Sequence, residues 1–460
     1  MLPVLTRDEM RAADAAALAT VSEDVLVGRA GTAVGHAALR ILGGGYGRRV
    51  MVVAGKGNNG ADGRVAAAFL ARRGARVAVL GAADAPAVLP PCDLVIDGAY
   101  GTGFTGSYDA PRVAGDTPVL SIDIPSGVDA DTGAAPGAAF HATHTVTFAA
   151  YKPGLLQGSG PELAGTVEVA EIGIPLPPSA AGLVEDADLP AWLVSRPRQS
   201  NKWTTALGIA AGSVGMEGSA VLCSRGALAG GSGMIRLGSP GDPAAPWPIE
   251  VVRMSLPATR WAASFLEATV KCHALAIGPG LGRDAATQEE IRAVIARAPL
   301  PLVVDADAIT ALGDLRSARQ LLAGRSHPTV LTPHDGEFAR LVGAPPSDDR
   351  LAAARDLAAQ LGAVVLLKGP LTAVAAPEHG PCDVLLAGAG VPALATAGSG
   401  DVLSGVIGAF LARGVAVHRA AALAAHVHGR AASRGRSEGL VAGDLPGLVS
   451  AYLSEARRHG

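Results

Sequence analysis

Short runs of valine, isoleucine and leucine alternate with alanine-rich segments along most of this 460-residue chain, and this alternation is the strongest constraint on its fold. Apolar strands that are spaced by helices predict α/β domains, in which helices cover both faces of a parallel sheet. We expect strands at residues 49–54, 75–80, 94–97, 119–124, 145–149 and 166–172, and again at 207–211, 234–237, 274–277, 302–305, 329–332 and 364–367. We expect helices at residues 288–298, 337–342 and 350–361, and after Asp401 and His418.

A proline-rich segment interrupts the alternation near the middle of the chain. Residues 174–200 are rich in proline and alanine and have no regular apolar pattern, which is typical of a linker between domains. We therefore predict a first domain over residues 1–200, with the linker from about residue 174, and a second domain over residues 201–460. The two should be separable near Ser200.

Charge and cysteine content argue against several classes of protein. The formal net charge is −3 and basic residues form no long run, so we expect neither nucleic acid nor a membrane as a partner. The charged start of the chain and the lack of a long uncharged apolar stretch predict a cytoplasmic protein. The cysteines lack the spacing of a zinc site or a disulfide framework. Lysine is rare, and the only lysines are Lys56, Lys152, Lys202, Lys271 and Lys368.

A glycine-rich loop follows the first strand of the predicted series. Residues 55–63 read Gly-Lys-Gly-Asn-Asn-Gly-Ala-Asp-Gly and formally match the G-x-G-x-x-G pattern of dinucleotide-binding folds. However, the next strand is not followed by an acid that could bind the ribose, since the nearest one is Asp84. The paired asparagines would crowd a pyrophosphate but offer amide oxygens that suit a hard cation. The loop therefore indicates a role other than ordinary NAD binding.

Acidic residues lie at the ends of two further strands of the first domain, in Val-Ile-Asp-Gly (residues 95–98) and Ile-Asp-Ile-Pro-Ser-Gly (residues 122–127). The carboxyl ends of parallel strands line the ligand crevice of an open α/β sheet. We therefore expect Asn59, Asp97, Asp123 and Ser126 to meet in one pocket, although each acid alone is more often a cap or turn residue.

These motifs resemble the NAD(P)H-hydrate epimerase family, as do Lys-Pro-Gly-Leu at residues 152–155 and Val-Ala-Glu-Ile-Gly-Ile-Pro at residues 169–175. The resemblance implies a Rossmann-like three-layer domain in which Asp123 is the acid/base residue and K⁺ is bound by Asn59, Asp97 and Ser126. It also implies contacts between the hydrated nicotinamide nucleotide and Asn58, Asn59, Gly60, Ala61, Asp62, Gly101, Thr102, Gly103, Phe104, Thr105, Gly106, Ser107 and Asp123. Relatives usually have glycine in place of Ala61. If φ is positive there, the methyl group costs about 1 kcal/mol and loosens the loop.

The second domain carries its clearest signal at residues 391–401, where Val-Pro-Ala-Leu-Ala-Thr-Ala-Gly-Ser-Gly-Asp runs directly into an apolar stretch. Small residues at the start of a helix leave its first N–H groups free to bind an anion such as phosphate. Asp401 would repel a phosphate, so we expect it to accept the proton of an attacking hydroxyl group instead. The helix N-terminus is expected to hold its pKa low. The alternative is a plain glycine turn with Asp401 as an ordinary first-turn residue.

Four other motifs stand at strand ends of this domain, at residues 277–282 (Ile-Gly-Pro-Gly-Leu-Gly), 304–308 (Val-Asp-Ala-Asp-Ala), 331–338 (Leu-Thr-Pro-His-Asp-Gly-Glu-Phe) and 367–372 (Leu-Lys-Gly-Pro-Leu-Thr). No P-loop sequence occurs. The set resembles the ribokinase-like superfamily and, within it, the ADP-dependent NAD(P)H-hydrate dehydratases, over most of residues 207–448.

By that resemblance, the second domain is a ribokinase-like α/β domain in which Mg²⁺ bridges the phosphates of ADP. The residues implied to contact ADP are Lys368, Gly369, Pro370, Leu371, Thr372 and Gly400. Those implied to face the hydrate are Gly218 or Ser219, Gly280, His334 and Asp401. Two departures stand out: Asp335 replaces a proline, and Asn201-Lys202-Trp203 replaces His-Lys-Gly.

Both resemblances in one chain imply metabolite repair of hydrated NADH and NADPH (NADHX and NADPHX). The first domain would interconvert their R and S epimers, and the second would dehydrate the S epimer with ADP, giving NAD(P)H, AMP and phosphate. We also expect a homo-oligomer. The alternatives are a ribokinase-like kinase that acts on a vitamin-precursor alcohol and a nucleotide-binding module with an inactive first domain. The fused first domain argues against the former, and retention of Asp123 argues against the latter.

Overall fold

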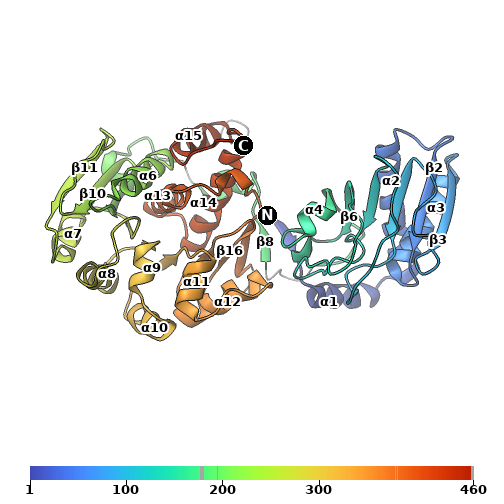
Figure 1. Cartoon of the computed structure of the whole chain (residues 1–460), viewed down its shortest axis with the longest axis horizontal. Helices are drawn as coiled ribbons and strands as arrows, with labels where there is room; N and C mark the ends of the chain where they lie inside the picture. The colour runs from blue at the N-terminus through green and yellow to red at the C-terminus, as the bar shows by residue number, and fades with distance from the viewer. Residues whose placement is uncertain (177–180, 194, 379, 381, 457–460) are drawn as a thin grey trace. The chain divides into compact units, whose positions relative to one another are not determined.

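The computed structural model describes residues 1–176, 181–193, 195–378, 380 and 382–456. The chain divides into two compact units, a first unit of Leu2–Ala180 and a second unit of Ala181–Gly460 with Met1. Each unit is a mixed α/β structure built on a largely parallel sheet (Figure 1).

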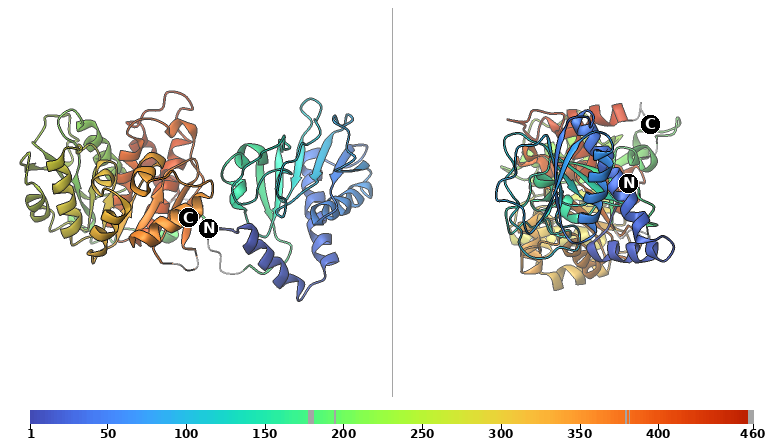
Figure 2. Two further views of the ribbon diagram at one scale, coloured as in Figure 1. Left: turned by 60° about the horizontal axis from the view of Figure 1, so that its bottom comes forward. Right: turned by 90° about the vertical axis from the view of Figure 1, so that its right-hand side faces the viewer.

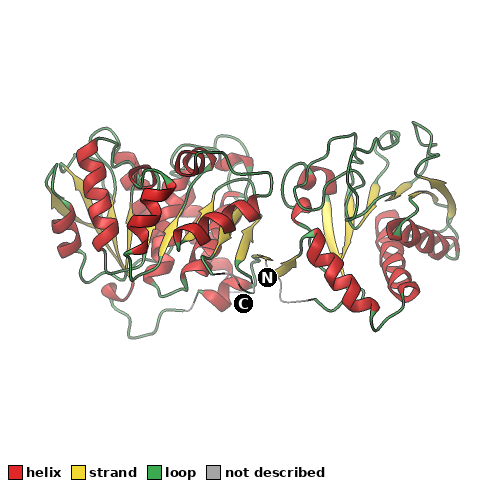
Figure 3. Cartoon of the chain, turned by 90° about the horizontal axis from the view of Figure 1, so that it is seen from below, coloured by secondary structure: helices red, strands yellow, loops and turns green. Residues whose placement is uncertain are grey.

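The first unit has a sheet with the strand order β3-β2-β4-β5-β6-β7, in which every neighbouring pair is parallel. Helices α2 and α3 pack against each other and on one face of this sheet, whereas loops between β3 and β6 cover most of the other face (Figure 3). Because the strands are parallel, the segments that follow β2, β4, β5 and β6 meet at one edge. The elements are β1 (Leu2–Val4), α1 (Arg7–Leu18), α2 (Glu23–Leu42), β2 (Arg49–Ala54), α3 (Asn58–Ala71), β3 (Arg76–Gly81), β4 (Leu94–Gly98), β5 (Val119–Ile122), β6 (His144–Phe148), η1 (Pro153–Leu155), α4 (Gly160–Ala164) and β7 (Thr166–Ala170).

Helix α2 is the one described helix that is long and apolar enough to cross a membrane by length and composition. Its buried side chains include Ala30, Val34 and Ala38, which belong to the core cluster beneath the sheet. The apolar face of α2 is therefore accounted for by packing within the first unit.

The second unit has a sheet with the strand order β8-β17-β16-β15-β14-β13-β12-β9-β10-β11. Neighbouring strands are parallel, except that β16 runs antiparallel to both β15 and β17. The strands are β8 (Ala181–Leu183), β9 (Ala206–Ala210), β10 (Met234–Pro240), β11 (Val251–Leu256), β12 (Ala274–Ile277), β13 (Leu302–Val304), β14 (Thr329–Leu331), β15 (Val364–Leu367), β16 (Thr372–Ala375) and β17 (Val384–Ala387).

Helices cover both faces of this second sheet. In Figure 1 the labels α6, α13, α14 and α15 lie on one side of it and α7 to α12 on the other, and Figure 2 gives two further views. The elements are α5 (Asp188–Trp192), η2 (Lys202–Thr205), α6 (Glu217–Ala229), α7 (Ala262–Ala268), α8 (Ala285–Arg297), α9 (Asp307–Ala311), α10 (Leu315–Ala323), α11 (Asp335–Val342), α12 (Arg350–Leu361), η3 (Pro392–Leu394), α13 (Ser399–Ala412), α14 (Val417–Ala432) and α15 (Leu445–Ala456).

The segment expected to be a linker contributes to the second unit. Strand β8 pairs with β17, and Leu189 and Trp192 of α5 belong to the same core cluster as α13 and α14. Between them, Asp186 lies 2.8 Å from His426 Nε2 and accepts hydrogen bonds from Arg430 Nη2 at 2.7 Å and Tyr452 Oη at 2.6 Å. The boundary between the units therefore falls at residue 180 instead of 200. Residues 177–180 and 194 of the expected linker lie outside the described residues.

Candidate active sites

A buried carboxylate and a buried lysine lie together at the sheet edge of the first unit. Asp123 follows β5 directly, with φ +67°, and the residue is 5% exposed. Its Oδ1 atom accepts hydrogen bonds from Lys152 Nζ at 2.5 Å and Thr147 Oγ1 at 3.2 Å, and its Oδ2 atom accepts one from Thr102 Oγ1. Burial alone would raise the pKa of Asp123, but the Lys152 ammonium and these hydrogen bonds hold it below its usual range. Asp123 is therefore ionised at neutral pH.

The Asn-Asn-Gly sequence forms the first turn of α3. A β-carbon at Gly60 would lie 2.0 Å from the carbonyl oxygen of Gly55, so only glycine fits there. Ala61 lies within α3 and is not among the non-glycine residues with positive φ. The strain considered for Ala61 is therefore absent, because alanine is well suited to a helix.

A pocket of about 980 Å³ lies beside Asp123, within the size range of small-molecule sites. Asp62 lines it and is only 4% exposed. Burial and, secondly, the negative charge of Asp123 raise the pKa of Asp62 to about 8. Among the carboxyl groups of the pocket, Asp123 is thus ionised and Asp62 protonated at neutral pH. Of the expected nucleotide contacts, Asn58, Asn59, Asp62, Gly101, Thr102, Gly103, Phe104, Thr105 and Asp123 line the pocket, whereas Gly60, Ala61, Gly106 and Ser107 do not.

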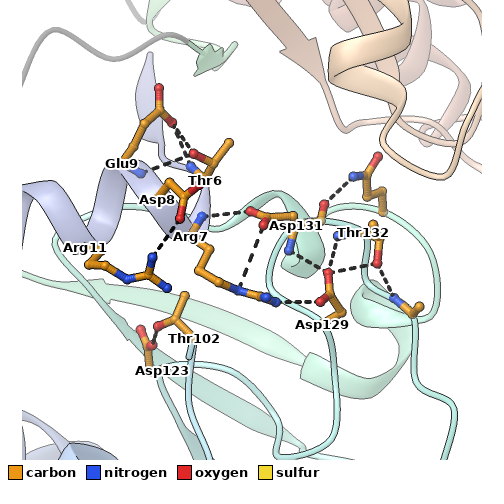
Figure 4. Close-up of polar contacts among 12 residues, drawn as sticks. Thr6, Arg7, Asp8, Glu9, Arg11, Thr102, Asp123, Asp129, Asp131 and Thr132 are labelled. Carbon is orange, nitrogen blue, oxygen red and sulfur yellow. Dashed lines mark hydrogen bonds and ion pairs between the residues drawn. The ribbon is translucent and has the colours of Figure 1, made fainter. Parts of the chain in front are cut away.

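Helix α1 also borders this pocket, which the sequence analysis missed. It begins with a capping box in which Thr6 and Glu9 bond to each other's backbone N–H groups. Arg7 fixes it to the loop that follows the Ile-Asp-Ile-Pro-Ser-Gly motif, because its guanidinium lies 2.5 Å from Asp129 and its backbone N–H donates to Asp131 at 2.8 Å (Figure 4). The pattern Thr-x-x-Glu at residues 6–9 was the available sequence signal for this helix.

The position of α1 brings further charged groups to the pocket. Arg11 and Asp14 both line it, and Figure 4 shows Arg11 on the side of Thr102 and Asp123. Burial and the charge of Asp123 raise the pKa of Asp14. These side chains were absent from the predicted site because no strand end carries them.

Asp97 is a fully buried carboxylate without a cationic partner among the hydrogen bonds and ion pairs of the described residues. It accepts hydrogen bonds from Ser121 Oγ at 3.0 Å, from the Ser126 N–H at 2.8 Å and from Ser126 Oγ at 2.5 Å. Burial, only partly offset by these bonds, raises the pKa of Asp97. A buried carboxylate of this kind is costly unless a cation compensates it.

The side chain of Asn59 points at two carbonyl oxygens near Asp97. Its Nδ2 atom donates to Ile122 O at 2.7 Å and to Tyr100 O at 3.2 Å. The Ser126 hydroxyl bonds to Asp97 and also to Tyr100 O at 3.1 Å, so carboxylate, hydroxyl and carbonyl oxygens gather beside this amide. Oxygen ligands of this type suit a hard cation, so the donor set fits the K⁺ implied by the sequence resemblance.

The second unit buries a similar pair of charges. Asp305 follows β13 directly and is 1% exposed. Its Oδ1 atom accepts hydrogen bonds from Thr332 Oγ1 at 2.7 Å and Lys368 Nζ at 2.8 Å, and its Oδ2 atom accepts one from Ser404 Oγ at 2.6 Å. Burial alone would raise the pKa of Asp305, but the Lys368 ammonium and these bonds hold it below its usual range. Asp305 thus connects the ends of β13, β14 and β15 with α13.

Asp401 lies in the first turn of α13, beside this pair. Gly398 has φ +88° and begins the helix without a side-chain cap. The N–H of Ser399 donates to Thr396 O at 3.3 Å, so the groups open to a ligand begin with the N–H of Gly400. A β-carbon on Gly400 would lie 3.4 Å from Lys368 Nζ, and one on Gly280 would lie 2.8 Å from the β-carbon of Ser219. Burial and, secondly, the charge of Asp305 raise the pKa of Asp401 to about 7, while a hydrogen bond with Ser219 opposes the rise. The expectation of a low pKa from the helix N-terminus is therefore wrong.

His334 lies at the start of α11 and serves as its cap. Its Nδ1 atom accepts hydrogen bonds from the N–H groups of Gly336 at 3.0 Å and Glu337 at 3.3 Å, and its ring remains partly exposed. Asp335, at the position where relatives have proline, forms an ion pair with Arg350 at 2.9 Å. Arg350 also donates to the carbonyl oxygen of Lys368 at 2.7 Å.

The structure brings together most of the residues predicted for the second site. Ser219, Gly280, Lys368, Gly400 and Asp401 meet around the start of α13. The turn of Gly369, Pro370, Leu371 and Thr372 follows Lys368 and is closed by a hydrogen bond from Thr372 Oγ1 to Gly369 O at 3.3 Å. Gly218 lies in the first turn of α6 with open space around it. Asp305 and Ser404 were not predicted as site residues, although the Val-Asp-Ala-Asp-Ala motif contained the former.

The fold and the two sites define a two-domain α/β protein in which each unit buries an aspartate–lysine pair at the strand ends of its sheet. The second unit resembles a ribokinase-like superfamily protein from Enterococcus faecalis V583 in fold, with 21% identity, a TM-score of 0.51 and coverage of 60% of this chain and 96% of that chain. The NAD(P)H-hydrate dehydratase family model matches residues 207–454, and the model for the YjeF-related protein N-terminus matches residues 23–87 and 81–154.

Relatives with both domains match almost the whole chain. It is 41% identical over 447 residues to the bifunctional NAD(P)H-hydrate repair enzyme Nnr of Mycobacterium tuberculosis (strain CDC 1551), covering 90% of each chain. It is 39% identical over 480 residues to the protein of the same name from Mycobacterium leprae, covering 97% of each. The chain therefore belongs to the family of bifunctional NAD(P)H-hydrate repair enzymes, which joins an epimerase and a dehydratase domain.

Proposed function

We propose that the chain repairs hydrated NADH and NADPH by two reactions, one in each unit. The observation that carries this proposal is the presence, in one chain, of a pocket with carboxyl groups of opposite protonation state and a helix N-terminus with a weakly acidic carboxyl group. The substrates are NADHX, NADPHX and ADP. A ribokinase-like kinase for a vitamin-precursor alcohol is not favoured, because the matched relatives contain both domains and are named as repair enzymes.

In the first unit, the two carboxyl groups suit exchange of a hydroxyl group at the carbon next to the ring nitrogen. Protonated Asp62 would donate a proton to the departing hydroxyl group, while ionised Asp123 would accept one from the water that adds to the other face. Lys152 and Thr147 hold Asp123 in place. K⁺ held by Asn59, Asp97 and Ser126 would supply a fixed positive charge that compensates Asp97.

In the second unit, Asp401 would accept the proton of the substrate hydroxyl group, which attacks the β-phosphorus of ADP and releases AMP. Elimination of the resulting phosphate ester, with loss of the adjacent ring proton, restores the double bond and releases phosphate. Lys368, Gly369, Pro370, Leu371, Thr372 and Gly400 would bind the nucleotide, and Ser219, Gly280 and His334 would face the hydrate. Free N–H groups at the start of α13 would stabilise the phosphoryl group.

Mg²⁺ would enter this site with the nucleotide. No group of three or more histidine, cysteine, aspartate or glutamate side chains that could hold a metal occurs among the described residues. Mg²⁺ commonly relies on substrate phosphates and water for most of its ligands, so the donor set is compatible with a nucleotide-borne ion. A cytoplasmic location and a homo-oligomer stay predictions.

The test is to incubate the protein with an equilibrated epimer mixture of NADHX and to follow recovery of the reduced-nicotinamide absorbance. With ADP, we expect recovery of the whole mixture, faster than spontaneous epimerisation allows and dependent on K⁺. Parallel reactions with ATP, and with NADPHX, determine the phosphoryl donor and the preferred substrate. Failure to recover NADH with either nucleotide would contradict the proposal, and phosphorylation of an unrelated alcohol would favour the kinase.

A further inference from the structure

The buried carboxylate Asp305 connects parts of the second site that are far apart in the sequence. Its three side-chain hydrogen bonds come from Thr332 after β14, Lys368 after β15 and Ser404 in α13. The residue is only 1% exposed, and both of its carboxylate oxygens are engaged by these three groups. We therefore expect Asp305 to affect the reaction through these partners and through its charge.

Two of these partners belong to or adjoin the reacting groups. Ser404 lies three residues after Asp401 in α13, and residues at this spacing share one face of a helix. Lys368 Nζ lies beside Gly400, at the open end of the same helix. A single carboxylate thus fixes both the helix that carries Asp401 and the ammonium group next to it.

We propose that Asp305 is a positioning residue of the dehydratase site, which holds α13 and Lys368 in register and adjusts the basicity of Asp401 through its negative charge. This inference rests on the proposed dehydratase function. The charge acts in a defined direction: Asp305 disfavours ionisation of Asp401, and Lys368 favours it. Without Asp305, the ammonium of Lys368 would also be uncompensated, and both changes would make Asp401 a weaker base.

Other charged and titratable groups near Asp401 and Lys368 also act on the basicity of Asp401. Asp307, which forms an ion pair with Arg283, adds a smaller negative charge from α9. Cys223 of α6 is neutral, because burial and then the charge of Asp401 raise the pKa of its thiol well above the usual value. Glu337 of α11 acts on Lys368, whose pKa is raised by Asp305 and Glu337 against the effect of burial. Asp305→Asn leaves the charges of Asp307, Arg283 and Glu337 in place, but it removes one of the charges that raise the pKa of the Cys223 thiol and of Lys368.

The experiment uses the full-length chain with Asp305→Asn and records ADP-dependent NADH recovery from the S epimer across pH. We expect kcat to fall about 10- to 100-fold through misplacement of the reacting groups. The acidic limb of kcat/KM should shift to lower pH by about one unit. Epimerisation by the first unit of the same chain should be unchanged. A parental pH profile, with or without a loss of thermal stability, would overturn the proposal.

Two further variants separate positioning from general destabilisation. Asp383→Asn breaks a comparable buried pair with Arg355 in the same unit, away from Asp401, and should leave the pH profile unchanged. Ser404→Ala keeps the Asp305–Lys368 pair but removes the bond to α13, so kcat should fall several-fold with the KM for ADP unchanged. If Asp305→Asn does not fold, parental kcat in Ser404→Ala overturns the proposal. Absence of dehydratase activity in the parental chain would instead contradict the proposed function itself.

Discussion

Each unit buries an aspartate against a lysine at the carboxyl edge of its sheet, in a chain with few lysines. In the first unit, Asp123 pairs with Lys152 and itself faces the pocket. In the second unit, Asp305 pairs with Lys368 but is buried, and the more accessible acid is the separate, partly buried Asp401.

The two aspartate–lysine pairs differ in which carboxyl group is left to exchange protons with the substrate. In the first unit the lysine holds the pKa of the pocket acid low, so Asp123 is ionised over a wide pH range. In the second unit the lysine compensates Asp305, and the pKa of Asp401 rises to about 7. The same kind of ion pair therefore keeps Asp123 permanently charged in one site and lies beside Asp401, which exchanges protons near neutral pH, in the other.

Separation of the units tests whether the two pairs act independently, and it has the largest expected effect. A fragment of residues 181–460 should be soluble and retain dehydratase activity. A fragment of residues 201–460 should not fold, because it lacks β8, the core residues of α5 and Asp186 with its three partners. Soluble expression and circular dichroism measure this. Equal behaviour of the fragments would show that residues 181–200 do not contribute to the fold.

Neutral isosteres of Asp123 and Asp401 should each slow one reaction only. Asp123→Asn should slow epimerisation by roughly 10²- to 10⁴-fold and spare recovery from the S epimer, whereas Asp401→Asn should do the reverse. ADP affinity should be unchanged or slightly higher in Asp401→Asn, because a negative charge is lost. Rates with separated epimers, together with ADP titration, measure both effects. Weak ADP binding with normal saturated turnover would show that Asp401 has a binding role instead.

Removal of a lysine tests the more deeply buried pair. Lys152→Met leaves Asp123 buried and unpaired, which should destabilise the first unit by about 3–5 kcal/mol. The double variant with Asp123→Asn removes the unpaired charge and should recover part of that loss. Denaturant unfolding of each variant, with dehydratase activity as the internal control, measures the coupling. Equal stability of the single and double variants would contradict the ion-pair interpretation.

The two reactions should also differ in their dependence on pH. Asp401 must be ionised to accept a proton, so dehydration should slow as pH falls below about 7. Asp62 must be protonated to donate one, so epimerisation should slow as pH rises above about 8. Profiles of kcat/KM measure both limbs. If both reactions lost activity at the same pH on the acidic side of their profiles, the proposed difference between the two aspartate–lysine pairs would be contradicted.

The sequence predicted the α/β order of both units because the central strands are continuous apolar runs, such as β2, β12 and β15. It missed β16 and β17, and it missed β11, which follows a proline-rich stretch. It also treated residues 181–193 as a linker, because their contacts are to α14, α15 and β17, far along the chain. Local pattern contains no information about such distant partners.

The candidate sites were predictable where function depends on strand ends. Asp97 lies near the end of β4, Asp123 and Lys368 directly follow strands, and parallel topology brings such positions to one edge. The role of Asp305 and the pKa of Asp401 depend on burial and on charges from other elements, which spacing along the chain does not reveal. The electrostatics of the helix end alone therefore predicted a lowered pKa for Asp401, whereas burial and the charge of Asp305 raise it.

The smallest predicted effect concerns Ala61 in the Asn-Asn-Gly turn of the first unit. Because Ala61 lies in α3 and is not a positive-φ residue, restoring the glycine of relatives should lower the free energy of unfolding by about 1 kcal/mol. Epimerase activity should not rise, since no strain is relieved. Ala68→Gly, at an exposed position of the same helix away from the pocket lining, is the matched control with a similar expected loss. Thermal unfolding and epimerisation rates of both variants measure the effect, and faster epimerisation in Ala61→Gly alone would show that the methyl group hinders the loop during catalysis.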